Sequence, residues 1–394
     1  MVPLFLVAYR VFALALAPIG GSLSLLLLFA CQSQEGAAFA VGALLFSLVP
    51  LLDLIARERE SRLLSFVAVV ALAGWVAITA WLFTVAPDGR SPATARVQNR
   101  YVKGDWHYPR AALGNLLPEL DQILLGLKIM PALDSHLTQE QSRQTAPITA
   151  AIYRELEADP DFHALGSVLP HAYDELWGQR IDHGHYFLYV PKNLDRQKPA
   201  PALVFLHGSG GNFKAYTWLL AKVADERGLV LISPTYGFGN WQEPDTTKTV
   251  KAVLKDAAKL VQIDPAQRHL IGLSNGGLGL CQAGMEIGEQ FRSLIFLSPV
   301  MDREAMSTPK FSRRWKDRPI LILTGQTDDR VPLESVTAAA TQMRKQGAQV
   351  TLESIPTADH FLLFTHRDQV LNRLSTWLKN LPPPPPDPEG VPNK

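Results

Sequence analysis

Long apolar runs fill most of the first 86 residues of the chain. Three stand out, and they extend from Val11 to Ala30, from Gly36 to Leu52 and from Leu63 to Ala86. A helix needs about 20 apolar residues to cross a bilayer core, with about 17 as the lower limit. The first and third runs meet this requirement comfortably, and the second meets it marginally. The pattern predicts a membrane anchor of about three transmembrane helices over residues 1–86.

Two alternatives for this region remain open. One is a cleaved signal peptide followed by a buried hairpin, but the highly charged tract RERESR, from Arg57 to Arg62, separates the second and third runs. The other is a lipobox, because LFAC, ending at Cys31, resembles the bacterial signal for cleavage and lipidation at that cysteine. Phe29 fits that signal poorly. Cleavage before Cys31 would leave two spans and the same location for the rest of the chain.

The arginines around these runs predict an orientation. Arg10 precedes the first run, and RERESR follows the second run. The connection between the first and second runs, CQSQEG, has no Lys or Arg. The positive-inside rule therefore puts the N-terminus and RERESR in the cytoplasm. Three crossings then put everything after Ala86 on the extracytoplasmic side. Basic residues just after Ala86 weaken this assignment without reversing it, since long domains translocate largely regardless of charge.

The pattern changes from about Tyr186 onward, where short β-rich apolar runs alternate with longer amphipathic stretches. The expected strands are YFLYV, ALVFL, VLIS, HLIGL, SLIFL, ILILT and VTLESI. The expected helices are Ala215 to Arg227, Thr247 to Val261, Gly276 to Ile287, Glu334 to Gln346 and Asp368 to Lys379. Near-continuous apolar strands separated by helices predict an α/β fold, with a doubly wound, mostly parallel sheet buried on both faces. We expect this domain to cover residues 181–381.

Residues 87–180 and the C-terminus give weaker signals. Helical apolar spacing at Leu116 to Leu127 and at Ile148 to Glu157 predicts a helical connecting region. If this region folds over the following α/β domain, it would form a cap on that domain. The tail, residues 382–394, is Pro-rich and is expected to be a polyproline II spacer.

Histidines in this middle region do not predict a metal site. His107, His136, His163 and His171 have no ligand spacing. His183 and His185 would share one face of a strand, so a metal is conceivable, but no third ligand is near and a strand start is favoured. We therefore expect no metal and no cofactor.

Composition excludes one class of function and limits the redox chemistry. The net charge is +1, so nothing indicates an electrostatic nucleic-acid binder. The cysteines are Cys31 and Cys281, and no disulfide is expected between them, so the fold must rest on its core. Cys281 is expected to be a small buried apolar residue.

The sharpest chemical signal is HLIGLSNGGLGL, which begins at His269. An apolar strand runs into Gly272-Leu273-Ser274-Asn275-Gly276 and then directly into a helical stretch. This is the G-x-S-x-G nucleophile elbow in its required setting. The turn strains the serine backbone, side chains at Gly272 or Gly276 would collide with neighbours, and Gly277 lets the helix lie close to the sheet. Ser274, at the positive end of that helix, is the predicted nucleophile.

A second glycine-rich segment, taken with the elbow, resembles the α/β-hydrolases over roughly Tyr186 to Leu381. ALVFLHGSGGN is an apolar strand followed by a small-residue loop, similar to the loop after the third strand of that superfamily. The resemblance implies an oxyanion hole formed by the backbone N–H groups of Ser209 and Asn275. One such donor typically contributes ~3 kcal/mol of transition-state stabilisation. His207 is expected to brace the loop.

The resemblance also implies the chain order serine, acid, histidine. ILILTGQTDDRVP is a strand ending in a loop whose spacing, G-x-x-D-x-x-V-P, is similar to the family's acid loop and selects Asp328, with Asp329 as the neighbouring alternative. VTLESIPTADHF is the last strand, followed by a loop that carries His360. His366 competes, but it falls at the start of the next helix. The predicted triad is Ser274, Asp328 and His360.

The motifs do not select one branch of the superfamily. HGSGGN and GLSNGG are similar to the dienelactone hydrolase, phospholipase/carboxylesterase and polyhydroxybutyrate depolymerase branches, and prolyl-oligopeptidase-type peptidases share G-x-S-x-G-G. The gap from Val300 to Arg318 is too short for the cap that lipases insert there, so the site is expected to be open unless residues 100–180 fold over it. Tyr236 and Trp241 either line the pocket or pack as ordinary aromatics.

Three functions follow from this resemblance. The favoured one is hydrolysis of carboxylic esters through an acyl-enzyme, outside the membrane. A serine peptidase of the prolyl-oligopeptidase type is second, because the soluble N-terminal region is too short for the usual β-propeller. A non-catalytic binding protein is third, because such proteins typically lose a triad residue. Expected partners are a small-molecule or polymeric ester and the lipid bilayer, without nucleic acid.

Overall fold

The computed structural model describes residues 4–89, 91, 95–104, 110–135, 137–162, 165–178 and 184–382. The predictions for the Pro-rich tail beyond Pro382 and for several histidines lie outside these residues; the histidines are His107, His136, His163 and His183. The chain forms two compact units, Met1–Gly89 with Tyr108–Tyr153, and Arg90–His107 with Arg154–Lys394. The domain limits expected from the sequence, at residues 86, 180 and 381, remain a prediction.

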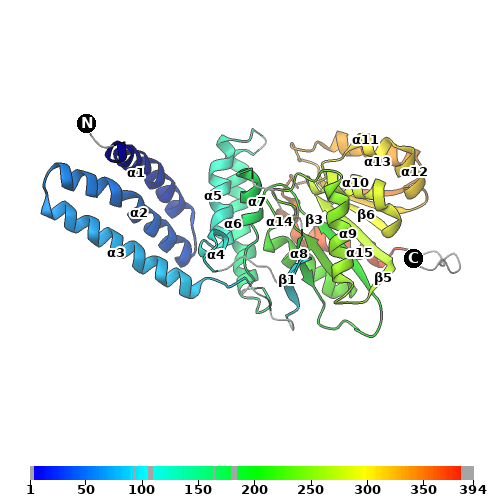
Figure 1. Cartoon of the computed structure of the whole chain (residues 1–394). Coiled ribbons are helices and arrows are strands. Elements are labelled where there is room, and N and C mark those ends of the chain that lie inside the picture. Colours follow the sequence, from blue (N-terminus) through cyan, green and yellow to red (C-terminus); the bar gives the residue numbers. More distant parts are fainter. Residues whose placement is uncertain are drawn as a thin grey trace. The chain divides into compact units, whose positions relative to one another are not determined.

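Among the described residues of the first unit, three helices are long and apolar enough to cross a membrane. They are α1 (Leu4–Ala30), α2 (Gln34–Glu58) and α3 (Arg62–Val85), and they pack side by side (Figure 1). Serine N-caps begin two of them, since the Ser33 hydroxyl accepts the N–H of Gly36 and the Ser61 hydroxyl accepts the N–H of Leu64. The predicted three-helix hydrophobic segment is confirmed.

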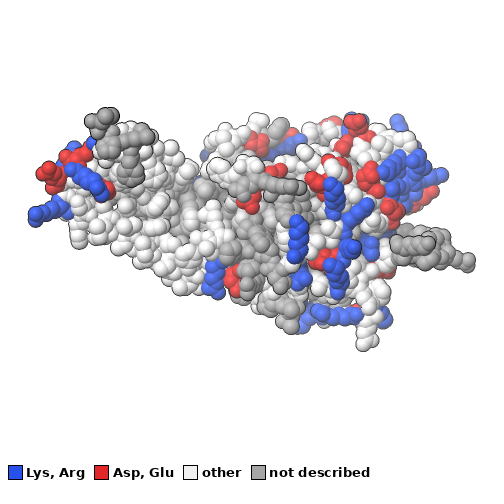
Figure 2. Space-filling view, viewed as in Figure 1, with Lys and Arg blue, Asp and Glu red and all other residues white. Residues whose placement is uncertain are grey.

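Polar contacts join the beginning of α1 to the end of α2. The Tyr9 hydroxyl donates to a carboxylate oxygen of Asp53 at 2.7 Å, and Arg10 pairs with Glu58 at 3.0 Å. Arg10 and the RERESR tract therefore lie at the same end of the bundle. Figure 2 shows charged side chains gathered at this end, while the visible sides of the three helices carry almost none.

The rest of the first unit is helical. Its elements are α4 (Leu113–Leu116), α5 (Glu119–Ile129), the 3₁₀ turn η1 (Met130–Ala132) and α6 (Gln139–Glu157), of which the last continues into the second unit. Asp121 of α5 is buried, and its carboxylate accepts the N–H of Gln32 at 2.7 Å and the hydroxyl of Ser33. The connection between α1 and α2 is thus tied to α5.

The second unit is built on one eight-stranded sheet with the order β1-β2-β4-β3-β5-β6-β7-β8. Its strands are β1 (Val97–Tyr101), β2 (His185–Tyr189), β3 (Ala200–Leu206), β4 (Val230–Pro234), β5 (Ile263–Leu273), β6 (Ser293–Leu297), β7 (Pro319–Gly325) and β8 (Gln349–Ile355). The two pairs that involve β2 are antiparallel, and all other pairs are parallel. The predicted mostly parallel sheet is confirmed.

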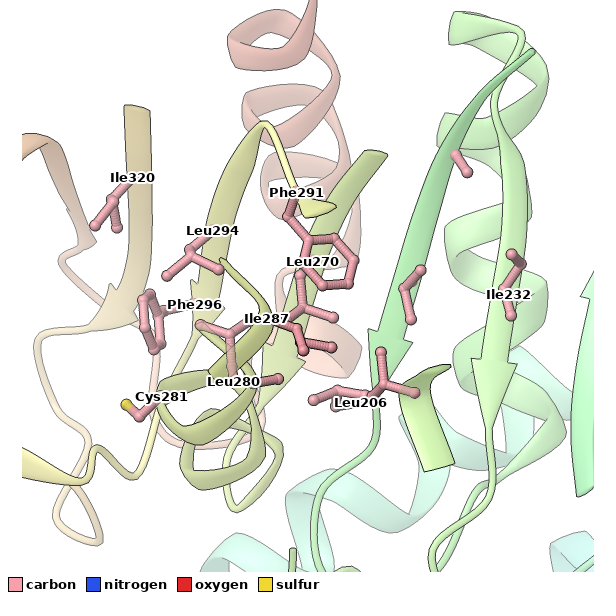
Figure 3. Packing of buried hydrophobic residues seen from close by; sticks show 14 of the residues in the cluster. Leu206, Ile232, Leu270, Leu280, Cys281, Ile287, Phe291, Leu294, Phe296 and Ile320 are labelled. Atoms are coloured by element: carbon pink, nitrogen blue, oxygen red, sulfur yellow. The ribbon is translucent and has the colours of Figure 1, made fainter. Parts of the chain in front are cut away.

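Helices cover both faces of this sheet (Figure 1). They are α7 (Pro170–Leu176), α8 (Lys214–Arg227), α9 (Asp245–Ala257), α10 (Gly276–Ile287), η2 (Gly288–Gln290), α11 (Arg303–Ser307), α12 (Pro309–Trp315), α13 (Leu333–Lys345), α14 (Leu362–Thr365) and α15 (Arg367–Lys379). Alternate residues of β3 point to opposite faces. Leu206 belongs to a core cluster that includes side chains of α9, α10, α12 and α13, and Figure 3 shows it near Leu280 of α10. Phe205 packs against Tyr216 of α8.

Cys281 lies fully buried in the cluster of Figure 3, as expected for a small apolar residue. Burial raises the pKa of its thiol to about 12, so the thiolate is suppressed at neutral pH.

One strand has no counterpart in the sequence pattern. Val97–Tyr101 was expected to fall in a helical region, but it forms β1 and pairs antiparallel with β2. Its sequence, VQNRY, lacks apolar alternation because only Val97 is buried in this edge strand. Hydrogen bonds to β2, rather than burial of one face, define the strand.

Candidate active site

The predicted elbow lies between β5, which ends at Leu273, and α10, which begins at Gly276. Ser274 has a φ of 51°, a left-handed conformation that costs a non-glycine residue about 1–3 kcal/mol. Three backbone hydrogen bonds hold it there. Its N–H donates to Leu297 at 3.0 Å, and its carbonyl accepts from Gly277 at 2.8 Å and from Val300 at 2.9 Å. The turn is therefore fixed by β6 and the loop that follows it.

Glycines make room for this turn. A Cβ at Gly272 would lie 2.5 Å from the carbonyl oxygen of Gly276, and one at Gly276 would lie 2.1 Å from that of Leu206. A Cβ at Gly277 would lie 2.4 Å from the carbonyl oxygen of Val300. All three contacts are with backbone, which cannot move aside as a flexible side chain would.

Replacing Gly276 by alanine is therefore expected to destabilise the unit by about 2–4 kcal/mol, because β3 or the elbow must shift. Thermal unfolding of the purified chain measures this effect. Gly126→Ala is the matched control, since a Cβ there meets no atom within 4 Å and the site is helical. An unchanged unfolding temperature for Gly276→Ala would contradict the packing described for the elbow.

The structure brings the three predicted triad side chains together. The Ser274 Oγ lies 2.8 Å from Nε2 of His360, and Nδ1 of His360 lies 2.9 Å from Oδ2 of Asp328. Asp328 and His360 are buried and Ser274 is partly exposed. Asp328 follows β7, His360 follows β8 and Ser274 follows β5. The carboxyl ends of these parallel strands lie at one edge of the sheet.

The competing residues do not join this line. Asp329 is exposed, whereas Oδ1 of Asp328 accepts the backbone N–H groups of Arg330 at 3.1 Å and Val331 at 2.9 Å. His366 lies within hydrogen-bond distance of the hydroxyls of Thr357 and Thr365. Only Asp328 and His360, among the four candidates, lie in the hydrogen-bonded line to Ser274.

The small-residue loop after β3 approaches the elbow closely. A Cβ at Gly208 would lie 3.2 Å from that of Ser274, and the Asn275 side-chain amide donates to the Ser209 hydroxyl at 2.7 Å. The N–H of Gly210 donates to the carbonyl of Phe238 at 2.8 Å. Within the described part of the chain, the backbone N–H groups of Ser209 and Asn275 have no hydrogen-bond partner. Both predicted oxyanion donors are therefore available to a ligand.

His207 braces this loop. Its ring is fully buried, and its Nδ1–H donates to the carbonyl of Gly208 at 2.8 Å, while Nε2 accepts the N–H of Tyr236 at 3.0 Å. Burial lowers its pKa to about 4. The imidazole is therefore neutral near pH 7, and both ring nitrogens are engaged by backbone.

Tyr236 and Trp241 are packed aromatics. Trp241 is buried, stacks on Tyr236 with ring centroids 4.6 Å apart, and donates its indole N–H to the carbonyl of His207 at 2.8 Å. Its ring also lies against Gly279, where a Cβ would be 2.9 Å away. This resolves the question left open by the sequence in favour of packing, because Gly279 of α10 leaves space that the indole fills.

One contact near the site was missed by the sequence analysis. Glu175 of α7 accepts the backbone N–H of Phe238 and the side-chain amide of Asn240, the latter at 3.3 Å. No motif marks this carboxylate, which precedes the first expected strand. The helix α7 thus contacts the loop after β4, beside the site.

One segment of the second unit matches a known protein family. The model of the prolyl oligopeptidase family matches residues 305–381, which include Asp328 and His360. None of the curated proteins compared gives a significant match.

Among solved structures, Est1E from Butyrivibrio proteoclasticus is 19% identical, with a TM-score of 0.41 over 50% of this chain and 93% of that one. FphF, a fluorophosphonate-binding serine hydrolase of Staphylococcus aureus, is 16% identical, with a TM-score of 0.41 over 50% and 92%. Esterase 2 of Thermogutta terrifontis is 20% identical, with a TM-score of 0.40 over 51% and 91%. The sheet order and the strand–turn–helix elbow give the second unit an α/β-hydrolase fold, and part of this unit, residues 305–381, is similar to the prolyl oligopeptidase family.

Proposed function

We propose that this chain is a membrane-anchored hydrolase that cleaves carboxylic esters through Ser274, His360 and Asp328. One observation carries the proposal, namely the hydrogen-bonded line from the Ser274 hydroxyl through His360 to Asp328. A serine hydroxyl is a weak nucleophile unless a base accepts its proton, and the base needs a carboxylate that orients it. The two available N–H groups beside Ser274 supply the remaining requirement, a site for a developing oxyanion.

The proposed reaction has two halves. The Ser274 Oγ attacks the ester carbonyl carbon while Nε2 of His360 takes its proton, and the N–H groups of Ser209 and Asn275 stabilise the oxyanion. Collapse of this intermediate breaks the bond to the alcohol oxygen, which receives the proton from the imidazolium and leaves. Water, deprotonated by His360, then attacks the acyl-enzyme and releases the acid, so that Ser274 regains its proton. Asp328 holds Nδ1–H and stabilises the imidazolium.

A screen with purified full-length chain tests the substrate class. Esters with one chromogenic alcohol and acyl chains of graded length would be hydrolysed with a maximum at one length. A small-molecule or polymeric ester is the proposed substrate. Absence of hydrolysis across the series, in protein that a fluorophosphonate still labels at Ser274, would contradict esters as substrates.

A peptidase is the second candidate, and the match of residues 305–381 to the prolyl oligopeptidase family favours it. Amide cleavage needs efficient protonation of a poor leaving group, so the ratio of ester to amide turnover discriminates between the two. Matched ester and anilide substrates with the same acyl group provide this ratio. A kcat/KM for the anilide equal to that for the ester would favour the peptidase.

The proposed location is outside the cytoplasm. The positive-inside rule supports it, because Arg10 and the RERESR tract lie at one end of the three-helix bundle, and the connection between α1 and α2 has no Lys or Arg. Three crossings place the hydrolase unit on the opposite side of the membrane from the N-terminus.

Protease added to intact cells is expected to remove the hydrolase unit, because no bilayer would protect it. An immunoblot with a C-terminal tag measures the loss, and a cytoplasmic protein serves as control for cell integrity. Protection of the unit until the membrane is breached would contradict the proposed orientation.

A further inference from the structure

The segment before the hydrolase sheet supports the loop that carries one proposed oxyanion donor. In α7, Glu175 presents both carboxylate oxygens to the loop after β4, where one accepts the N–H of Phe238 and the other accepts the Asn240 amide. Glu175, which precedes the sequence motifs in the chain, thus places its carboxylate against the loop that lies next to the proposed oxyanion loop.

A second contact joins the same segment to the oxyanion loop directly. A Cβ at Gly211 would lie 2.9 Å from the Leu169 side chain and 3.3 Å from that of Ala172. Leu169 precedes α7 and Ala172 lies within it, and both are buried. The segment from Leu169 to Glu175 therefore packs against both loops that flank the oxyanion site.

Two hydrogen bonds made by Phe238 connect Glu175 to the oxyanion loop. Phe238, whose N–H bonds to Glu175, uses its carbonyl to accept the N–H of Gly210 at 2.8 Å. The next residue, Gly239, presses on the same loop, because a Cβ there would lie 2.3 Å from the carbonyl oxygen of Gly208. Residue 238 is thus held on one side by the carboxylate and holds Gly210 on the other.

The oxyanion loop needs such support because of its composition. Gly210 and Gly211 have φ values of 99° and 117°, and Gly239 opposite them has a φ of 100°. Glycine allows these conformations but gives up more conformational entropy than any other residue when it is fixed. Fixing the N–H of Gly210 on Phe238 sets the peptide that follows Ser209. The peptide that carries the N–H of Ser209 is held as well, because its carbonyl, that of Gly208, lies against Gly239 and accepts a hydrogen bond from His207.

We propose that Glu175 is a positioning residue for the oxyanion hole, acting through Phe238 and Gly210 on the backbone N–H of Ser209. This inference rests on the proposed function. Glu175 touches neither substrate nor a triad residue, so its removal weakens stabilisation of the oxyanion without changing the nucleophile or the base. The effect appears in kcat rather than in KM, because the oxyanion forms only in the transition state and intermediate.

Kinetics of full-length variants test the inference. Glu175→Ala is expected to lower kcat on a carboxylic ester by about 10- to 100-fold with KM nearly unchanged, which is less than the loss of a whole donor. Glu175→Gln keeps an acceptor oxygen for the N–H of Phe238, so it should stay within about threefold of the wild type. Asn240→Ala, the matched control, removes only the bond at the other carboxylate oxygen and should also stay within about threefold.

A thionoester with the same acyl and alcohol groups separates oxyanion stabilisation from general damage. Sulfur accepts hydrogen bonds weakly, so the hole contributes little to its turnover, and the loss in Glu175→Ala should shrink to less than about threefold. Thermal unfolding identifies variants that fail to fold. If Glu175→Ala is one of them, Glu175→Asp, whose carboxylate is one methylene shorter, replaces it with the same expectations.

Equal losses on the ester and the thionoester, or a loss confined to KM, would overturn the inference. Wild-type kcat in Glu175→Ala would overturn it as well, while leaving the proposed function intact. The failure of the inference can be told from the failure of the proposed function. If the wild-type chain shows neither Ser274-dependent hydrolysis nor fluorophosphonate labelling, the proposed function is wrong and the inference, which rests on it, is wrong as well.

Discussion

Replacing Ser274 by alanine is expected to lower kcat for ester hydrolysis by about 10⁶-fold, the scale seen when the serine of such a triad is removed. The substitution deletes only the hydroxyl that lies 2.8 Å from Nε2 of His360. Alanine keeps the Cβ, so the strained φ of 51° and the backbone hydrogen bonds of the elbow should persist. The loss would then report chemistry and not folding.

A fluorophosphonate probe gives a second measurement of the same residue. It should label the wild type covalently and leave Ser274→Ala unlabelled, while both proteins unfold at similar temperatures. Ser335→Ala is the matched control, since this exposed hydroxyl of α13 lies outside the proposed site. Labelling that persists in Ser274→Ala would assign the nucleophile elsewhere, and it would also revive a non-catalytic role for the elbow.

Exchange of Asp328 for asparagine should lower kcat by about 10⁴-fold, equivalent to about 5 kcal/mol of transition-state stabilisation. The structure explains why asparagine cannot substitute. Oδ1 of Asp328 already accepts the N–H groups of Arg330 and Val331, so the asparagine oxygen must take that position. Its NH₂ group would then face Nδ1 of His360 and force the tautomer whose Nε2 carries the proton. That nitrogen could no longer accept the proton of Ser274.

Asp329→Asn is the matched control, because the same change is made one residue along in the same loop. Asp329 is exposed and lies outside the line from Ser274 to Asp328, so its variant should lose at most about tenfold in kcat. Measuring kcat for both folded variants on one ester decides between the two carboxylates. If Asp329→Asn is the crippled variant, the acid moves one residue along, and if neither matters, the third triad member lies elsewhere.

The features that the sequence predicted correctly depend on short-range patterns. The parallel strands are buried on both faces, so each appears as a continuous apolar run such as ALVFL, which ends at Leu206 of β3. The elbow was identified because its geometry demands glycine at Gly272 and Gly276, where a Cβ would strike backbone. The three helices that are long and apolar enough to cross a membrane were predicted as well, since each is an almost unbroken apolar stretch.

Features that depend on a partner distant in the chain could not be predicted from the sequence. The strand β1 has one buried residue, Val97, and it exists because β2 supplies its hydrogen bonds. Trp241 is packed because Gly279 of α10, distant in the chain, leaves room for its ring. The orientation of the Asp328 side chain depends on two backbone N–H groups that donate to its Oδ1. The two adjacent aspartates in the sequence do not by themselves indicate which one receives these hydrogen bonds.

Residue types and spacings along the chain thus determined the fold class and the serine, histidine and carboxylate candidates, because buried strands, tight turns and membrane spans each restrict which residues can occur locally. The family resemblance selected Asp328 and His360, and the tertiary structure places both in a hydrogen-bonded line with Ser274. Tertiary structure alone revealed that Glu175 contacts the loop beside the site. The physical reason is that a hydrogen bond between distant residues depends on where the folded backbone places both partners, and Glu175 lies 63 residues from the loop residue that it holds.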